Sequence, residues 1–91
     1  MVSGKFMIVN ENGLHVRPAG ALVSMCRPFD ADVMLKFNET EYNLKSVLGI
    51  VSANIKFGDV VEFVCNGPEE EAALKAIEEA VKSGFSGGTY N

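Results

Sequence analysis

Two stretches of the sequence carry apolar side chains at every second position, which is the period of a β-strand with one buried face. The alternating residues are Val33, Leu35 and Phe37 in the first stretch and Val61, Phe63 and Cys65 in the second. A single strand cannot bury such a face by itself. The pattern therefore predicts a sheet that other elements cover on one side.

Two other segments carry apolar residues at three- and four-residue steps, which predicts amphipathic helices. The first spans residues 16–27, with Pro18 tolerated in its first turn and Pro28 ending it. Its predicted buried stripe consists of Val16, Ala19, Leu22, Val23 and Cys26.

The second helix begins after Gly67 and Pro68 and ends at Gly84. Glu69, Glu70 and Glu71 suit its positive end, Lys82 suits its negative end, and Leu74, Ile77 and Val81 form its buried stripe.

Shorter elements complete the predicted order. Residues 5–9 read as a strand before a turn, and residues 41–44 read as a strand that pairs with its predecessor through the polar turn 38–40. Ser46 is a good N-cap for a short helix over residues 47–53. The order β-α-β-β-α-β-α predicts an α+β fold, with a four-stranded antiparallel sheet and three helices on one face.

The chain has 91 residues, 47% hydrophobic and 22% charged, which fits one small globular domain over residues 1–91. Residues 85–91 are small and polar, so we expect a flexible tail. A domain of this size has little room for an enclosed pocket. The functional site is therefore expected on the surface.

The net charge of −4 argues against binding to nucleic acid or to an anionic membrane, and favours protein partners. No apolar run is long enough to span a bilayer and the first residues do not resemble a signal peptide, so we expect a cytoplasmic protein. Cys26 and Cys65 have no metal-binding spacing and read as reduced core residues, with a disulfide as the alternative.

His15 is the only histidine and lies in the run GLHVRPAG, between a glycine turn and the start of the first helix. The first N–H groups of a helix lack intrahelical partners and the helix dipole is positive there, so an anion is stabilised. The N–H groups of Val16 and Arg17 would point at such an anion, and the Arg17 guanidinium would add a planar cation. These residues predict a nucleophilic imidazole beside a phosphate-binding cradle.

A neutral imidazole can accept a phosphoryl group and pass it on. The sequence has no glycine-rich nucleotide loop and no acidic cluster for Mg²⁺, so we expect no cofactor and no direct use of ATP. Other proteins would supply and remove the phosphoryl group, which makes the chain a carrier and not an enzyme. The simpler interpretation of His15 as a solvated or capping residue stays open at this point.

Ser46 also has two interpretations. As an N-cap its hydroxyl would accept a hydrogen bond from a free N–H group. A phosphate on Ser46 would also suit a helix N-terminus and would add negative charge beside a docking face. The pattern alone favours the cap, and it favours the core for apolar residues at helical spacing, such as Val23, Leu48 and Val51.

The run GLHVRPAG resembles the active-site segment of HPr, the histidine-containing phosphocarrier of the bacterial sugar phosphotransferase system. The segment NLKSVLGIVS, from Asn43 to Ser52, is similar to the second-helix segment of that family with its regulatory serine. GDVVEF followed by an acidic helix completes the order. The resemblance covers nearly the whole chain and implies the family's open-faced β-sandwich.

The resemblance implies that Enzyme I phosphorylates His15 on Nδ1, with phosphate from phosphoenolpyruvate, and that sugar-specific IIA domains accept it. Arg17 and the N–H of Val16 would steady the phosphoryl group. Ser46 would match the position that HPr kinase/phosphorylase modifies in many Gram-positive bacteria, where a catabolite-control transcription regulator is a further partner. The residues that we assign to partner docking are Gly20, Val23, Ser24, Arg27, Val47, Leu48 and Val51.

Several positions depart from the family pattern. Val16 stands where Ala or Thr is usual, Gly20 stands where Thr, Ser or Ala is common, and the apolar patch on the second helix has fewer methionines. The chemistry survives because Val16 contributes only its backbone, but the identity of the partners is left open. Two alternatives remain beside the sugar carrier: a regulatory module that acts mainly through phospho-Ser46, and a carrier in a non-sugar phosphorelay. Nothing in the sequence requires more than a monomer.

Overall fold

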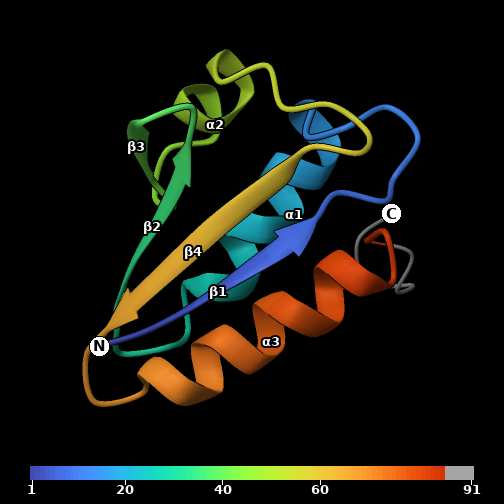
Figure 1. Cartoon of the computed structure of the whole chain (residues 1–91). Coiled ribbons are helices and arrows are strands. Elements are labelled where there is room, and N and C mark those ends of the chain that lie inside the picture. The colour runs from blue at the N-terminus through green and yellow to red at the C-terminus, as the bar shows by residue number, and fades with distance from the viewer. Residues whose placement is uncertain (86–91) are drawn as a thin grey trace.

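The computed structural model, described over residues 1–85, contains four strands and three helices in the predicted order. The strands are β1 (Val2–Met7), β2 (Asp32–Phe37), β3 (Thr40–Asn43) and β4 (Val60–Asn66), and the helices are α1 (Val16–Cys26), α2 (Val47–Ser52) and α3 (Glu70–Lys82). The sheet has the order β1-β4-β2-β3, and every neighbouring pair is antiparallel. The helices lie on one side of the sheet (Figure 1), so the predicted α+β fold is confirmed.

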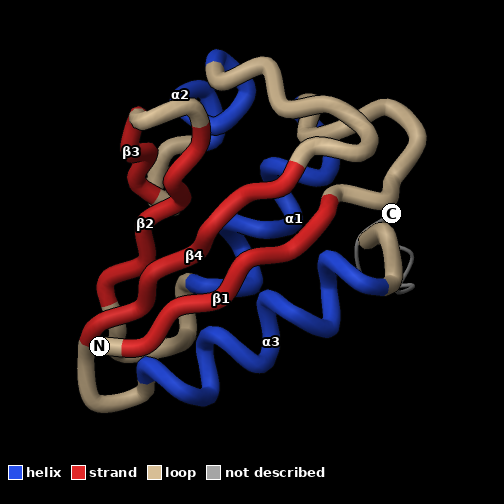
Figure 2. The backbone as a smooth tube through the Cα atoms, viewed as in Figure 1, coloured by secondary structure: helices blue, strands red, loops and turns tan. Residues whose placement is uncertain are grey.

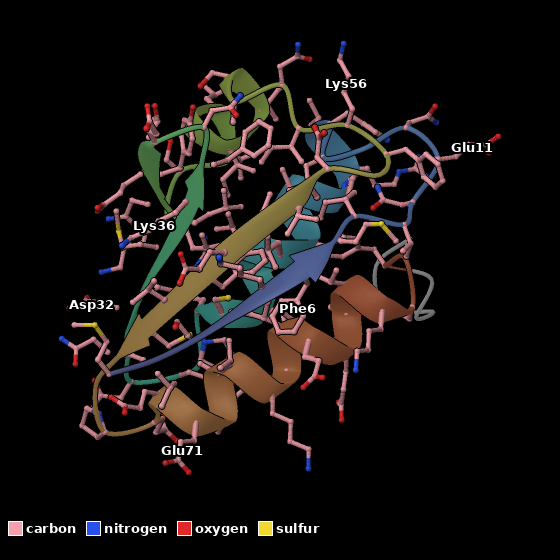
Figure 3. All side chains as sticks on the ribbon, in the orientation of Figure 1. Phe6, Glu11, Asp32, Lys36, Lys56 and Glu71 are labelled. Carbon is pink, nitrogen blue, oxygen red and sulfur yellow. The ribbon has the colours of Figure 1, made fainter. Side chains whose placement is uncertain are left out.

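The core lies between the helices and the covered face of the sheet. β2 and β4 turn Val33, Leu35, Val61, Phe63 and Cys65 toward this core, and each of these side chains is buried. Phe6 of β1 packs against the same core, and its ring centroid lies 6.2 Å from that of Phe63. Figure 3 shows Phe6 beside α3. The two-residue alternation thus predicted the buried face of both central strands.

The first strand differs from the prediction. It spans Val2–Met7 and not residues 5–9, and it pairs with β4 from Val2 opposite Cys65 to Met7 opposite Val60. The residues at positions 3–5 are small or polar, so the early part of the strand lacks an apolar pattern. The apolar Ile8 and Val9, which extended the predicted strand, come after its end. Ile8 is fully buried although it follows the last paired residue. Its apolar side chain belongs to the core, which is why the sequence pattern placed it in the strand.

Burial of two apolar residues also differs from the prediction. The sequence predicts Val16 in the buried stripe of the first helix, but its side chain is 63% exposed, and the buried residues of α1 begin at Pro18. Phe85 was assigned to a flexible tail, but it is only 7% exposed and its N–H donates to the carbonyl of Ala80. The rest of the expected tail lies outside the described residues.

The hairpin between β2 and β3 turns through Asn38 and Glu39, which both have left-handed backbone angles, with φ of 51° and 63°. Two consecutive left-handed residues are typical of the type I′ turn, whose twist matches that of a hairpin. Asparagine adopts this conformation readily, whereas glutamate does so only where tertiary context requires it. The predicted hairpin is confirmed, with the turn one residue shorter.

Candidate phosphoryl-transfer site

The loop that leads into α1 is held against the loop that follows α2. Figure 2 shows these two loops together at one end of the sheet, and Figure 3 shows Glu11 and Lys56 extending from them. The N–H of Leu14 donates to the carbonyl oxygen of Ile55 at 3.0 Å, and the Leu14 side chain is buried. The Asn10 side-chain amide donates to the carbonyl oxygen of Gly13.

Gly13 allows this contact for two reasons. Its φ is +70°, which L-residues with side chains rarely adopt, and a Cβ at this position would lie 2.3 Å from the carbonyl oxygen of Ile55. The close approach of the two backbones fixes where the next helix begins. The glycine turn of the sequence is therefore a requirement of the site.

His15 is the N-cap residue of α1, with an extended backbone (φ −83°, ψ −167°). Its carbonyl oxygen accepts the N–H of Ala19 at 3.0 Å, while its side chain makes no capping hydrogen bond. The imidazole is exposed and lines two open depressions. One depression also contains Arg17 and Phe85, and the other contains Val51 and Phe57. A partner can therefore reach the ring without displacing any core residue.

The start of α1 has unused capacity to bind an anion. Among the described residues, neither the N–H of Val16 nor that of Arg17 has a hydrogen-bond partner, and Pro18 has no N–H to satisfy. The Arg17 side chain is exposed and has no carboxylate within 4.0 Å in the part of the chain that is described. Unpaired donors, the positive end of the dipole and a free guanidinium all favour negative charge beside His15.

Ser46 caps α2 as predicted. Its Oγ accepts the N–H of Gly49 at 3.0 Å, and the residue is exposed. The hydroxyl is therefore used structurally, while its position on the surface leaves it accessible to a modifying enzyme.

The residues assigned to docking fall into different environments. Leu48 is 79% exposed, and Val47 and Val51 are partly buried against the core. Ser24 and Arg27 are exposed, and a Cβ added at Gly20 would meet nothing within 4 Å. Val23 is only 4% exposed, so its assignment to docking is wrong. It lies on the side of α1 that faces the core, where its helical spacing had already favoured it.

One exposed aromatic residue beside His15 was not singled out from the sequence. Phe57 is 64% exposed and lines the same depression as His15 and Val51. Its only sequence signal is an aromatic side chain between Lys56 and the turn residue Gly58. That pattern does not distinguish a core residue from a surface one, so only the fold identifies Phe57 as a contact candidate.

The two cysteines are free and buried, which confirms the prediction of reduced core residues. Burial, together with the nearby Cys65 thiol, raises the pKa of Cys26 to about 12. Burial first, and Glu70 second, also raise the pKa of Cys65. Both thiols are therefore protonated and unreactive at neutral pH.

Within residues 1–85 no group of three or more His, Cys, Asp or Glu side chains could hold a metal ion. No helix among these residues has the length and apolar content to cross a membrane.

The model of the family described as "PTS HPr component phosphorylation site" matches residues 2–83. The chain belongs to the HPr family. The match includes α1, α2 and the loops that hold His15, so the HPr resemblance seen in GLHVRPAG extends over the whole fold. HPr proteins are phosphocarriers of the phosphotransferase system, and the chain is a phosphocarrier of this type.

Solved HPr structures agree with this assignment. HPr-C-His from Thermoanaerobacter tengcongensis is 33% identical, with 93% of this chain and 96% of that chain covered and a TM-score of 0.89. The phosphocarrier protein HPr from Bacillus anthracis is 31% identical, with 88% and 95% covered and a TM-score of 0.83. The catabolite repression protein Crh of Bacillus subtilis, described as an intertwined dimer, is 30% identical, with 92% and 97% covered and a TM-score of 0.74.

Proposed function

We propose that this HPr-family protein accepts a phosphoryl group on His15 from Enzyme I, which draws it from phosphoenolpyruvate, and donates it to sugar-specific IIA domains. The observation that carries the proposal is the exposed His15 imidazole beside the unpartnered N–H groups of Val16 and Arg17. The exchange would take place in the cytoplasm, where phosphoenolpyruvate is formed.

The proposed chemistry is a reversible in-line displacement at phosphorus. The lone pair of Nδ1 of His15 attacks the phosphoryl group, and the bond between phosphorus and the donor's leaving atom breaks with its electron pair. The proton of the neutral ring stays on Nε2 in this step. The N–H groups of Val16 and Arg17 and the Arg17 guanidinium stabilise the phosphoryl oxygens. Transfer to an acceptor nucleophile regenerates neutral His15, so the chain has no substrate turnover of its own.

The test is incubation with phosphoenolpyruvate and Enzyme I. The intact protein should acquire one acid-labile, base-stable phosphoryl group, and His15→Ala should acquire none. Arg17→Ala should be labelled more slowly, while Ser46→Asn, which keeps a capping side chain, should be labelled as fast as the unmodified chain. Absence of label on the intact protein, or equal labelling of His15→Ala, would contradict the proposal.

The distribution of charge supports a partner with an acidic rim. Residues 12–29 and 43–58, which hold α1, α2 and most of the two loops beside His15, contain four basic residues and no acidic one. The acidic Glu11, just before the first of these segments, also lines both depressions at His15. The rest of the chain contains all twelve acidic residues and the other four basic ones. Exposed Val16, Leu48 and Phe57 provide apolar contact area within or beside these segments. The proposed partner surface is therefore apolar at its centre and acidic around it.

A second candidate is a regulatory module in which phosphorylated Ser46 recruits a transcription regulator, with HPr kinase/phosphorylase as the modifying enzyme. The observations that favour it are the exposure of Ser46 and the similarity to Crh, which is named for catabolite repression. A phosphate at Ser46 would lie at the start of α2 next to Lys45.

Substitutions separate the two candidates. If regulation is the main function, His15→Ala binds the regulator normally after Ser46 is phosphorylated, and Ser46→Asn does not bind it. If the chain is chiefly a carrier, sugar uptake is lost in His15→Ala and retained in Ser46→Asn. Asparagine is the better substitution here because it caps a helix and cannot be phosphorylated.

A further inference from the structure

The face of the sheet that points away from the helices carries a regular arrangement of side chains. We call it the open face. Its residues are Ser3, Lys5 and Met7 of β1, Val60, Glu62, Val64 and Asn66 of β4, Asp32, Met34 and Lys36 of β2, and Glu41 and Asn43 of β3. Figure 3 labels Asp32 and Lys36 along β2. In the described residues no element covers this face, since the helices lie on the other side of the sheet.

One row of the open face alternates in charge across all four strands. The register places Lys5 opposite Glu62, Glu62 opposite Lys36, and Lys36 opposite Glu41. Only the last pair comes within ion-pair range, at 4.0 Å between Nζ of Lys36 and Oε2 of Glu41. From β1 to β3 the charges are positive, negative, positive and negative.

The adjacent row is apolar in the middle and polar at both ends. Ser3 lies opposite Val64, Val64 opposite Met34, and Met34 opposite Asn43. Val64 and Met34 are only half-buried although they occupy the two central strands. Beyond this row Asn66 of β4 lies opposite Asp32 of β2.

These rows are self-complementary under a two-fold rotation. Consider two copies of the sheet face to face, with the axis parallel to the strands and between β4 and β2. Each row then meets the same row of the second copy in reverse order. Lys5 faces Glu41, Glu62 faces Lys36, and both contacts occur twice, as an isologous interface requires.

The other rows match in the same arrangement. Val64 faces Met34 at the centre, Ser3 faces Asn43 at the edges, and the amide of Asn66 faces the carboxylate of Asp32. An apolar centre with a polar rim is the usual anatomy of an interface. Aligned sheets stack with their strand directions within about 30° of each other, and an axis along the strands keeps the facing strands within that range.

We propose that two copies of this chain associate face to face through the open face. The contact leaves α1 and α2 on the outer side of each copy, so His15 of both copies stays available to partners. The proposal is independent of the proposed phosphoryl transfer, because it concerns the opposite face of the sheet and is tested without phosphorylation. The face is small, so the association is weak, with a dissociation constant on the order of 1 mM.

The test follows amide chemical shifts and sedimentation from about 0.05 to 3 mM, a range that brackets the expected dissociation constant. Shifts should move with concentration on the four strands and not on α1 or α2. Lys5→Glu and Glu41→Lys should each weaken association about tenfold, since each places two like-charged pairs in the dimer. An equimolar mixture of the two variants should associate again, because all four pairs are then opposite in charge. The double variant K5E/E41K should recover association for the same reason.

This design separates contact between copies from other effects of charge. Glu41→Lys lowers the net negative charge and would favour association if only net charge mattered. Glu71→Lys and Lys75→Glu, both on exposed positions of α3, are the matched controls and should not weaken association. Alternating charges also neutralise each other within one copy, but that effect cannot produce recovery in the mixture.

Three results would overturn the proposal. They are a chain that stays monomeric throughout the concentration range, association with shifts confined to α1 and α2, and a mixture no stronger than its components. If the chain stays monomeric and the variants lose binding to a different protein, the open face is assigned to that protein. Normal labelling of His15 in a chain that fails to associate would leave the proposed carrier function intact.

Discussion

Two glycines near His15 have opposite structural roles. Gly13 has a left-handed backbone and no room for a Cβ, while Gly20 lies in the middle of α1 with open space where a Cβ would be. Gly20→Ala should therefore stabilise the protein by about 0.5–1 kcal/mol, because alanine loses less backbone entropy in a helix. Gly13→Ala should destabilise it by more than about 1 kcal/mol. Urea denaturation of both variants measures the free energy of unfolding, and a stable Gly13→Ala would contradict the proposed loop contact.

Substitution of Phe57 should change the KM for the phosphorylated donor and leave the free energy of unfolding nearly unchanged. Its exposed ring lines a depression with His15, so a protein that reaches the imidazole covers it. Phe57→Ala should raise the KM for the phosphorylated donor by about tenfold, typical of an aromatic contact residue, with kcat and unfolding free energy nearly unchanged. Val60→Ala removes another exposed apolar side chain, on the open face and away from His15, and serves as the control. An unchanged KM in Phe57→Ala would exclude the residue from docking.

The two buried thiols make a prediction about reactivity and pH. In the folded protein the pKa of Cys26 is about 12, and that of Cys65 is also raised from 9.0. Alkylation at neutral pH should therefore proceed only through unfolding, as mass spectrometry with and without urea can measure. Because both pKa values are higher in the folded state, unfolded thiols ionise first. The stabilising effect is complete below about pH 9 and is lost as pH rises toward 12. Rapid labelling of the native protein would contradict this environment.

At the scale of elements, α2 depends on its cap more than the longer helices do. It has six residues, and a helix of that length is not stable by propensity alone. Ser46→Ala removes the hydrogen bond to the N–H of Gly49 and should cost about 1 kcal/mol of unfolding free energy. Ser46→Asn should stay within a few tenths of a kcal/mol of the unmodified protein. Thermal unfolding distinguishes the variants, and equal stability of all three would show that packing of Val47, Ile50 and Val51 holds α2 without the cap.

The dipoles of α1 and α3 are neutralised to different extents by their own side chains. α1 begins with free donors at His15, and its first turn contains no acidic residue to occupy the positive end of the dipole. α3 places Glu70 and Glu71 in its first turn and pairs Lys82 with Glu78 at 2.7 Å in its last. α3 is therefore neutralised by its own side chains, whereas α1 leaves its N-terminus to a ligand.

At the scale of the whole molecule, the segregated charges predict how fast partners are found. The basic segments around α1 and α2 should steer an acidic partner surface toward His15, so the second-order rate of phosphorylation should fall with ionic strength. Lys56→Ala should weaken that dependence, while Lys75→Ala on α3 should not. Stopped-flow or quenched-flow measurements at several salt concentrations provide the comparison. A rate that does not change with salt would rule out electrostatic steering.

The sequence by itself determined the order of elements, the buried faces of β2 and β4, the start of α1 at His15 and the cap at Ser46. These are local features, in which the period of apolar residues or one capping side chain specifies the conformation of its own segment. Only the tertiary structure decided that Phe85 is buried, that Val16 and Phe57 are exposed, and that the loop at Gly13 touches Ile55. Burial depends on which distant segment covers a side chain, and no local pattern contains that information. The start of α1 with its unpaired N–H groups was thus predictable from GLHVRPAG, whereas the exposure of the side chains around it was not.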